Sequence, residues 1–228
     1  MEWTLEAPPI KGEHKPTRYQ DSDNFGAGEY GGEQNSECGV LSPNWQFNHA
    51  PRREFISLTE REGYLRLYAF STADGTDDFF KIGNVICQRY LTFDHVIAEC
   101  KMDISFMAVG QEAGLAHFNG GISFSSLGVK LTKEGLRITS DLKAYDIPVD
   151  CTEIIFRTTV SADELRVHFF YSTDGGAVFT EFGSGYVPCT GNYRGDYIGM
   201  YTFNNQSPSD TVGVGGKVDI DYFRYEFE

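Results

Sequence analysis

Positive charge is scarce in this chain of 228 residues, and long apolar runs are missing. It has 19 Lys and Arg against 33 Asp and Glu, which gives a formal net charge of −14. Nucleic-acid grooves and anionic membrane surfaces both need clustered Lys and Arg. No apolar stretch approaches the roughly 20 residues of a transmembrane helix. The composition therefore predicts no nucleic-acid partner and no membrane partner.

Cysteines are few and lack the spacing of a metal or redox motif. None forms a C-x-x-C pair, and their number is odd, so we interpret them as free thiols in a reducing compartment. The start of the chain has neither the basic residues nor the apolar core of a signal peptide. We therefore predict a cytoplasmic protein, or a secreted one if a signal lies upstream of this sequence. The cysteines are Cys38, Cys87, Cys100, Cys151 and Cys189.

Motifs for nucleophilic catalysis and for phosphate binding are also missing. There is no G-x-S-x-G, and the five His show no triad spacing. The glycine clusters at 26–28 and 213–216 lack the Lys and the helix that follow in a phosphate loop.

Aromatic residues and glycines are abundant, with 18 Phe, 13 Tyr, 2 Trp and 25 Gly. This pairing is typical of strands joined by tight turns. From Val218 to Phe227 apolar and polar residues alternate strictly, and the apolar side holds Val218, Ile220, Tyr222 or Phe223, Tyr225 and Phe227. Period-2 alternation predicts a strand with one buried face.

Short strand-like runs recur along the rest of the chain, and Gly-containing turn signals such as Glu62-Gly63 and Asp174-Gly175 separate them. They predict an all-β fold of two packed antiparallel sheets, a β-sandwich, over residues 21–228. Residues 1–20 contain Pro8-Pro9 and Lys15-Pro16 and are predicted to be an extended arm or linker. The predicted strands are 54–59, 64–70, 84–90, 95–107, 113–118, 121–124, 135–140, 153–160, 164–171, 177–182, 197–203 and 217–227.

Six segments resemble, in order, the C-terminal β-sandwich of glycoside hydrolase family 43, the β-xylosidases and α-L-arabinofuranosidases. Each piece alone is weak, but together they extend over almost the whole chain. Glu62 stands where the family has Pro, and Phe47 and Phe55 stand where Trp is common. The segments are Trp45–Pro51 (W-x-W-N-H-x-P), Phe55–Leu67 (W-S-L-T-E-R-P-G-Y-L-R-L), Cys87–Arg89, Gln111–Leu115 (Q-x-A-G-L), Phe170–Gly175 and Asp219–Phe223 (D-F-D-Y-F).

The resemblance implies a concanavalin A-like jelly roll that accompanies a catalytic five-bladed propeller. In the family two Asp and one Glu on that propeller hydrolyse the sugar, and no segment of this sequence corresponds to it. The resemblance thus implies a non-catalytic accessory domain that supports hydrolysis or binding of xylan- or arabinan-type oligosaccharides. A lectin-like carbohydrate-binding module and a purely structural docking domain for a propeller are the alternatives.

The resemblance also places a loop at Asp74–Phe80, which in the family is directed toward the mouth of the propeller's active site. An aromatic side chain there would stack on a sugar, so Phe79 and Phe80, with Asp77 and Asp78 beside them, are candidate binding residues. The alternative is that Phe79 or Phe80 anchors the core at the start of the next strand.

Trp45, Asn48 and His49 form a second candidate, an indole platform beside hydrogen-bonding groups. Trp45 and Phe47 share one strand face, so core packing of the indole is the competing interpretation. His49 would need an orienting carboxylate to serve as a base, and none is near in sequence. Asn48 and His49 therefore fit a domain interface better than catalysis.

Three aspartates are candidate ligands for calcium. Asp23 lies near the start of the predicted domain, and Asp219 and Asp221 lie on its last strand. They would converge if the first and last strands paired, and Ca²⁺ takes 6–8 oxygen ligands. The alternative is that they form the wet face of the strand.

Arg89 and Gln111 are polar residues within apolar strand patterns. Buried polar groups need partners, so both are expected to hydrogen-bond across a sheet or to line its groove.

Overall fold

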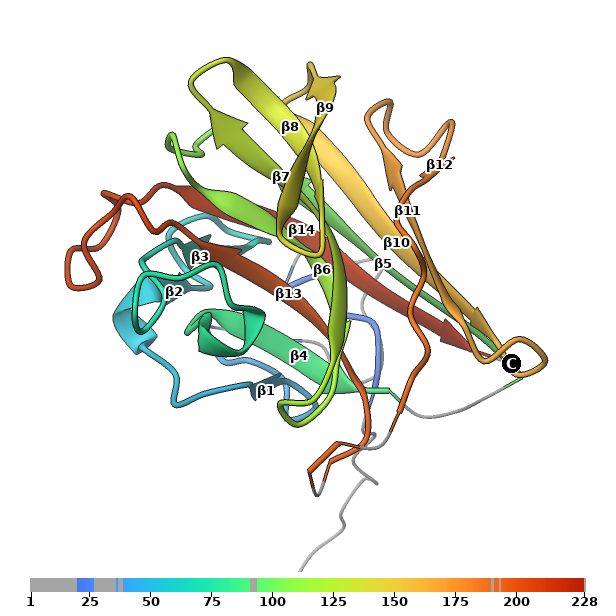
Figure 1. The fold of residues 1–228 in the computed structure, drawn as a ribbon. Coiled ribbons are helices and arrows are strands. Elements are labelled where there is room, and N and C mark those ends of the chain that lie inside the picture. The colour runs from blue at the N-terminus through green and yellow to red at the C-terminus, as the bar shows by residue number, and fades with distance from the viewer. Residues whose placement is uncertain are drawn as a thin grey trace, which may run out of the picture.

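The computed structural model describes residues 20–26, 36, 39–90, 94–189, 191–192 and 194–227. Nearly all of the predicted arm, and Cys38, lie outside these residues. The described chain folds into two antiparallel seven-stranded sheets packed face to face (Figure 1). The prediction of an all-β, two-sheet sandwich is confirmed. No helix in the described part of the chain is long and apolar enough to cross a membrane.

The first sheet contains the longest strand, which is β14 (Lys217–Phe227). The order of this sheet is β12 (Thr180–Glu181), β11 (Val167–Ser172), β10 (Glu153–Ser161), β5 (His95–Asp103), β14, β3 (Leu65–Tyr68) and β2 (Ile56–Ser57). The order of the second sheet is β1 (Gln46–Phe47), β4 (Val85–Arg89), β13 (Tyr197–Phe203), β6 (Glu112–Phe118), β7 (Phe124–Thr132), β8 (Gly135–Ser140) and β9 (Lys143–Val149).

The last strand departs once from the predicted alternation. A register shift between Ile220 and Tyr222 moves the apolar side from Val218 and Ile220 to Phe223 and Tyr225, which all belong to the core between the sheets. Tyr222 lies outside this core cluster, and its hydroxyl donates to Glu99 Oε1 at 2.7 Å. A bulge inserts one extra residue and so changes the phase of a strand.

Three strands were missed or shortened by the sequence prediction. β1 has only two residues, too few for a periodic pattern. β7 (Phe124–Thr132) was predicted only as a strand ending at Phe124, because Gly128 interrupts its alternation. A side chain does not fit at Gly128, since Ala113 O and Tyr201 Oη each lie 2.6 Å from the position that a Cβ would take. β9 was not predicted. It contains Pro148, and proline disfavours a strand unless the strand lies at the edge of a sheet. The structure places β9 at such an edge.

A second apolar cluster covers the outer face of the second sheet. Along β6 the side chains alternate, so Ala113 and Leu115 face the core between the sheets, whereas Ala116 and Phe118 face outward. The 3-10 helix η2 (Phe79–Lys81) lies against this outer face, and Phe79 is fully buried there. The ring of Phe79 stacks on Phe124 at 4.8 Å with an interplanar angle of 11°.

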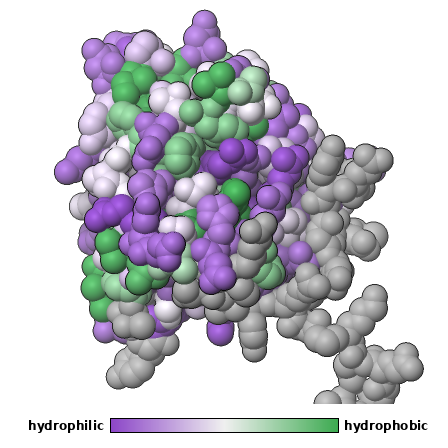
Figure 2. Space-filling model, turned by 90° about the vertical axis from the view of Figure 1, so that its right-hand side faces the viewer, coloured by the Kyte–Doolittle hydropathy of each residue, from purple (hydrophilic) through white to green (hydrophobic). Residues whose placement is uncertain are grey.

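The remaining surface is mixed in polarity. Figure 2 shows the side that carries β10 to β12, where hydrophilic residues surround separate groups of hydrophobic ones. Cys87 and Cys100 are buried free thiols, and Cys151 and Cys189 are free as well.

Replacing Phe79 by Ala is expected to lower the free energy of unfolding by about 3–5 kcal/mol, because it removes a buried ring and leaves a cavity. Urea unfolding followed by intrinsic fluorescence measures the change. Val178→Ala is the control, since Val178 is 63% exposed and its loss should change stability by less than about 0.5 kcal/mol. Equal unfolding midpoints for Phe79→Ala and the wild type would contradict the assignment of Phe79 to a core.

Candidate functional site

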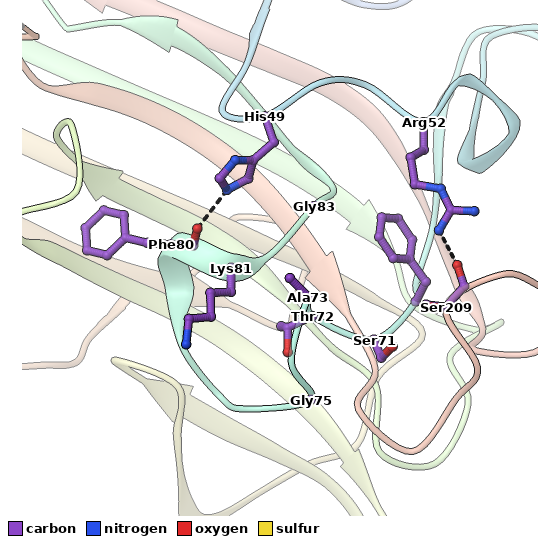
Figure 3. A pocket seen from close by; sticks show the side chains of 11 residues that line it. His49, Arg52, Ser71, Thr72, Ala73, Gly75, Phe80, Lys81, Gly83 and Ser209 are labelled. Carbon is purple, nitrogen blue, oxygen red and sulfur yellow. Dashed lines mark hydrogen bonds between the residues drawn. The ribbon is translucent and has the colours of Figure 1, made fainter.

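Two adjoining pockets lie beside η2 and share His49 and Phe80 in their walls. The larger pocket, of about 530 Å³, is shown in Figure 3. It is lined by His49, Arg52, Phe70, Ser71, Thr72, Ala73, Gly75, Phe80, Lys81, Gly83 and Ser209. The smaller pocket, of about 320 Å³, is lined by Asn48, His49, Phe80, Gly120, Gly121 and Arg194.

His49 and Phe80 are joined by a hydrogen bond that fixes the wall between the pockets. The ring nitrogen Nε2 of His49 lies 2.7 Å from the carbonyl oxygen of Phe80, so Nε2–H is the donor (Figure 3). His49 is exposed and Phe80 is half-buried. The Phe80 ring contacts Phe79 and Phe124 edge to face, both at 5.8 Å between centroids. One side of the Phe80 side chain is therefore anchored in the outer cluster while the residue still lines both pockets.

The loop before η2 is held by its own carboxylates. Asp78 accepts from the Phe80 N–H at 3.0 Å and so caps η2. Asp74 accepts from the hydroxyl of Thr76 at 2.6 Å and pairs with Lys81. The residues of the predicted loop therefore have different roles. Phe79 packs in the outer apolar cluster, Phe80 lines both pockets, and Asp74 and Asp78 hold the loop in its conformation.

Asp77 connects this loop to the neighbouring strands. It accepts from Asn205 Nδ2 at 2.7 Å and pairs with Lys130 Nζ at 3.4 Å. Asn205 Oδ1 in turn accepts from the backbone N–H and the hydroxyl of Thr72, both at 2.9 Å, and Thr72 lines the larger pocket. The pocket wall is therefore tied to the second sheet through hydrogen bonds and one ion pair.

Arg52 closes the other side of the larger pocket. Its guanidinium lies over the rings of Phe55 and Phe70, at 4.3 and 5.0 Å, and donates to the carbonyl oxygen of Ser209 (Figure 3). Arg52, Ser209 and Arg194 were not predicted as site residues. For Arg52 a signal was present, because it directly follows the matched segment that ends at Pro51.

Trp45 does not line either pocket. It is 7% exposed, belongs to the core between the sheets, and packs edge to face on Phe223 at 5.1 Å. Its Nε1–H donates to Asp23 Oδ2 at 2.7 Å. The structure therefore favours core packing for Trp45, while Asn48 and His49, three and four residues further on, reach the pockets.

The three candidate calcium ligands have other partners. Asp23 and Phe223 form a backbone bridge, so the expected pairing of the two chain regions is present. The buried Asp23 carboxylate accepts from Phe25 N–H at 2.8 Å, Ser36 Oγ–H at 2.5 Å and the Trp45 indole. Asp221 pairs with Lys101 at 3.0 Å.

Asp219 is fully buried and faces two guanidinium groups. Arg66 Nε donates to it at 2.7 Å and Arg61 Nη1 at 3.0 Å. Burial alone would raise the pKa of Asp219, but the two arginines outweigh it and hold the pKa below its ordinary value. Within the described residues, no three His, Cys, Asp or Glu side chains gather into a group that could hold a metal ion.

Gln111 and Arg89 lie away from the two pockets. Gln111 is fully buried, donates from Nε2 to Thr202 Oγ1 at 2.9 Å, and accepts from the Ala108 N–H at 3.0 Å. It is a structural hydrogen-bonding residue in this fold. Arg89 ends β4, is exposed, and lies opposite Tyr197 on β13.

Glu112, next to Gln111, is a buried acid that the sequence analysis did not single out. Its Oε1 accepts from Thr139 at 2.9 Å and from Tyr201 at 3.1 Å, whereas Oε2 lies 3.8 Å from Lys130 Nζ. Burial raises the pKa of Glu112 to about 7. Lys130 stands between Glu112 and Asp77, so a group that titrates near neutrality borders the site loop.

The ionisation of Glu112 should therefore appear in the pH dependence of stability. With its pKa raised by burial from 4.5 to about 7, the folded state binds the proton more tightly than the unfolded state. The stabilisation is complete below pH 4.5 and is lost as the pH rises through about 7. Glu112→Gln should thus gain up to about 3 kcal/mol relative to the wild type between pH 5 and pH 8.

Urea unfolding at pH 5, 6, 7 and 8 provides the measurement, and Glu134→Gln, at an exposed position, is the matched control. A difference between Glu112→Gln and the wild type that stays constant over this range would show that Glu112 does not titrate there.

Comparison with known proteins identifies a family whose model matches most of the chain. The model described as the β-xylosidase C-terminal concanavalin A-like domain matches residues 37–226. A β-xylosidase of Formosa agariphila is 28% identical over 210 residues, which covers 82% of this chain and 34% of that protein. A putative β-xylosidase of Xylanibacter ruminicola is 28% identical over 165 residues, covering 72% of this chain and 29% of the relative.

Solved structures share the fold. A bifunctional GH43-CE protein of Bacteroides eggerthii superposes with a TM-score of 0.71 at 24% identity, covering 91% of this chain and 26% of that chain. For a xylan β-1,4-xylosidase from Bacillus halodurans the TM-score is 0.70 at 19% identity, covering 96% and 41%. The chain spans about a third of the length of the curated relatives that it matches.

Proposed function

The chain belongs to the family of β-xylosidase C-terminal concanavalin A-like domains, and on that premise we propose that it is a sugar-contacting, non-catalytic accessory domain of a family 43 glycoside hydrolase. It would support hydrolysis or binding of xylan- or arabinan-type oligosaccharides. The single observation that carries the proposal is the position of Phe80. This half-buried aromatic residue lines two adjoining pockets. The resemblance to the family implies that its loop would be directed toward the active site of a catalytic propeller.

The chemistry of the pockets fits binding rather than hydrolysis. Glycoside hydrolysis needs two carboxyl groups about 5–10 Å apart on either side of the scissile bond. None of the described residues that line the two pockets is Asp or Glu. They offer instead the aromatic residues Phe70 and Phe80 beside hydroxyl, imidazole and guanidinium groups. Such a combination suits the apolar face and the hydroxyl groups of a sugar.

The geometry also gives a role to the rigid loop. Asp78 caps η2 and Asp77 ties the loop to Asn205 and Lys130, so Phe80 is held in place before any ligand arrives. Preorganisation reduces the entropy lost on binding. Within a larger enzyme, this loop would complete the substrate pocket of a five-bladed catalytic propeller.

A purely structural docking domain is the second candidate, and one observation favours it. A third hollow, of about 460 Å³, is lined partly by the apolar residues Val40, Leu41, Phe47, Ile56 and Leu58. Val40 is 68% exposed and lies beside these apolar groups. An apolar surface of this kind is suited to burial by a propeller partner.

Sugar binding is tested by isothermal titration of the chain with xylo- and arabino-oligosaccharides. Phe80→Ala should weaken binding about tenfold, since the stacking contact is lost. Phe80→Leu keeps apolar bulk without a ring and should lose nearly as much. Tyr145→Ala is the control, because Tyr145 is 44% exposed on β9, at the edge of the sheet opposite β1.

Unfolding midpoints measured for each variant separate a loss of binding from a loss of structure. Saturable binding that Phe80→Ala leaves unchanged would move the site elsewhere. The absence of binding to both xylo- and arabino-oligosaccharides would leave the docking domain as the function.

A further inference from the structure

The charge of the two pockets is opposite to that of the whole protein. The chain has a formal net charge of −14, yet the ionisable side chains described in the pocket walls are Arg52, Lys81, Arg194 and His49. With 33 acidic residues against 19 basic ones, a pocket wall with the average composition of the chain would contain more carboxylates than cationic groups. The local excess of cationic groups therefore calls for a ligand-based explanation, provided that these cations are not already neutralised.

The cations of the larger pocket are neutralised by carboxylates just outside it. Arg52 pairs with Glu54 at 3.0 Å. Lys81 pairs with Asp74 and, at 3.6 Å, with Asp78. These two basic groups therefore have their counter-ions and shape the loop, and a neutral ligand suits the larger pocket.

Arg194 in the smaller pocket has no such partner. It is exposed, and its guanidinium carbon lies 5.7 Å from the ring centroid of Tyr197. No Asp or Glu within the described parts of the chain forms an ion pair with it. A guanidinium presents a fork of donors that matches a carboxylate in two parallel hydrogen bonds. Arg194 is thus available for an anion from outside the described residues.

Part of the wall of the smaller pocket is backbone without a side chain. Gly121 has a φ of +95°, and no heavy atom beyond its own residue and its chain neighbours lies within 4 Å of the position that a Cβ would take. A ligand can therefore approach the main chain at this point without meeting a side chain. Asn48 and Phe80 complete the pocket with an amide and an aromatic side chain.

We propose that the smaller pocket binds a uronic acid residue of an acidic oligosaccharide, whose carboxylate pairs with the Arg194 guanidinium. The sugar ring lies between Phe80 and the backbone of Gly121, and Asn48 and His49 are placed to hydrogen-bond its hydroxyl groups. This inference rests on the proposed sugar-binding function and specifies the class of its ligand. A neutral part of the same oligosaccharide continues past Phe80 into the larger pocket.

The negative charge of the whole protein does not oppose this assignment at close range. At physiological ionic strength the Debye length is about 8 Å, so distant surface carboxylates are largely screened. A direct contact between guanidinium and carboxylate inside a pocket is screened much less. Selection between acidic and neutral sugars is accordingly a local property of Arg194.

The test compares three ligands by isothermal titration at pH 7. They are an unbranched xylo-oligosaccharide, the same oligosaccharide with one glucuronic acid branch, and the branched form with its carboxyl group reduced to an alcohol. The acidic form is expected to bind about tenfold more tightly than the reduced form. Arg194→Gln should abolish this difference, whereas Arg194→Lys should retain part of it.

Arg137→Gln is the matched control, because Arg137 lies on β8 and pairs with Asp146 away from both pockets. It should preserve the preference for the acidic ligand. Equal affinity of the wild type for the acidic and the reduced form would overturn this inference and leave the proposed sugar-binding function standing. A preference that persists in Arg194→Gln would also overturn it, and would leave Arg194 available to a carboxylate on a protein partner. The absence of binding to all three ligands would overturn this inference, and the proposed sugar-binding function would then depend on the titration with arabino-oligosaccharides.

Discussion

Phe79 packs against Phe118, Phe124 and Tyr201 on the outer face of the second sheet, and this contact determines where the covered part of the face ends and the pockets begin. At this place the short helix η2 covers the outer face of the sheet, and its Phe79 ring packs into the apolar cluster there. Because Phe79 is inserted, the half-buried Phe80 lies at the rim of this cluster, where it lines both pockets and its carbonyl oxygen accepts from His49. The position of the candidate site is therefore a consequence of core packing one residue away.

The polar contacts beneath the loop extend this dependence into the sheet. Glu112, Lys130, Asp77 and Asn205 form a continuous series from a buried carboxyl group to the wall of the larger pocket. A buried carboxyl group is costly to ionise, and its cost depends on the placement of the one lysine nearby. The loop, the sheet and the protonation state of Glu112 thus belong to one coupled unit.

Much of the fold was accessible from sequence because turns and alternation are local properties. Gly63 and Gly175, predicted as turn residues, have φ values of +75° and +74°. The site was accessible only in part. Asn48, His49 and Phe80 lie in segments with a recognisable pattern, but Arg194 joins them through a loop whose path depends on tertiary packing. Glu112 was missed for a related reason: an acid in a strand is usually on the wet face, whereas here side chains of other strands, Thr139, Tyr201 and Lys130, surround it.

The edges of both sheets bear on how such a domain behaves beside other chains. β1, β2 and β12 have two residues each, and β9 carries the exposed Pro148 as well as the exposed, charged Lys143 and Asp146. Unpaired strand edges recruit further strands, and short edges or a proline prevent this. The sandwich is consequently protected against intermolecular strand addition and aggregation, despite its many aromatic residues. Contacts with a neighbouring protein are left to side chains and loops, which can be changed without disturbing either sheet.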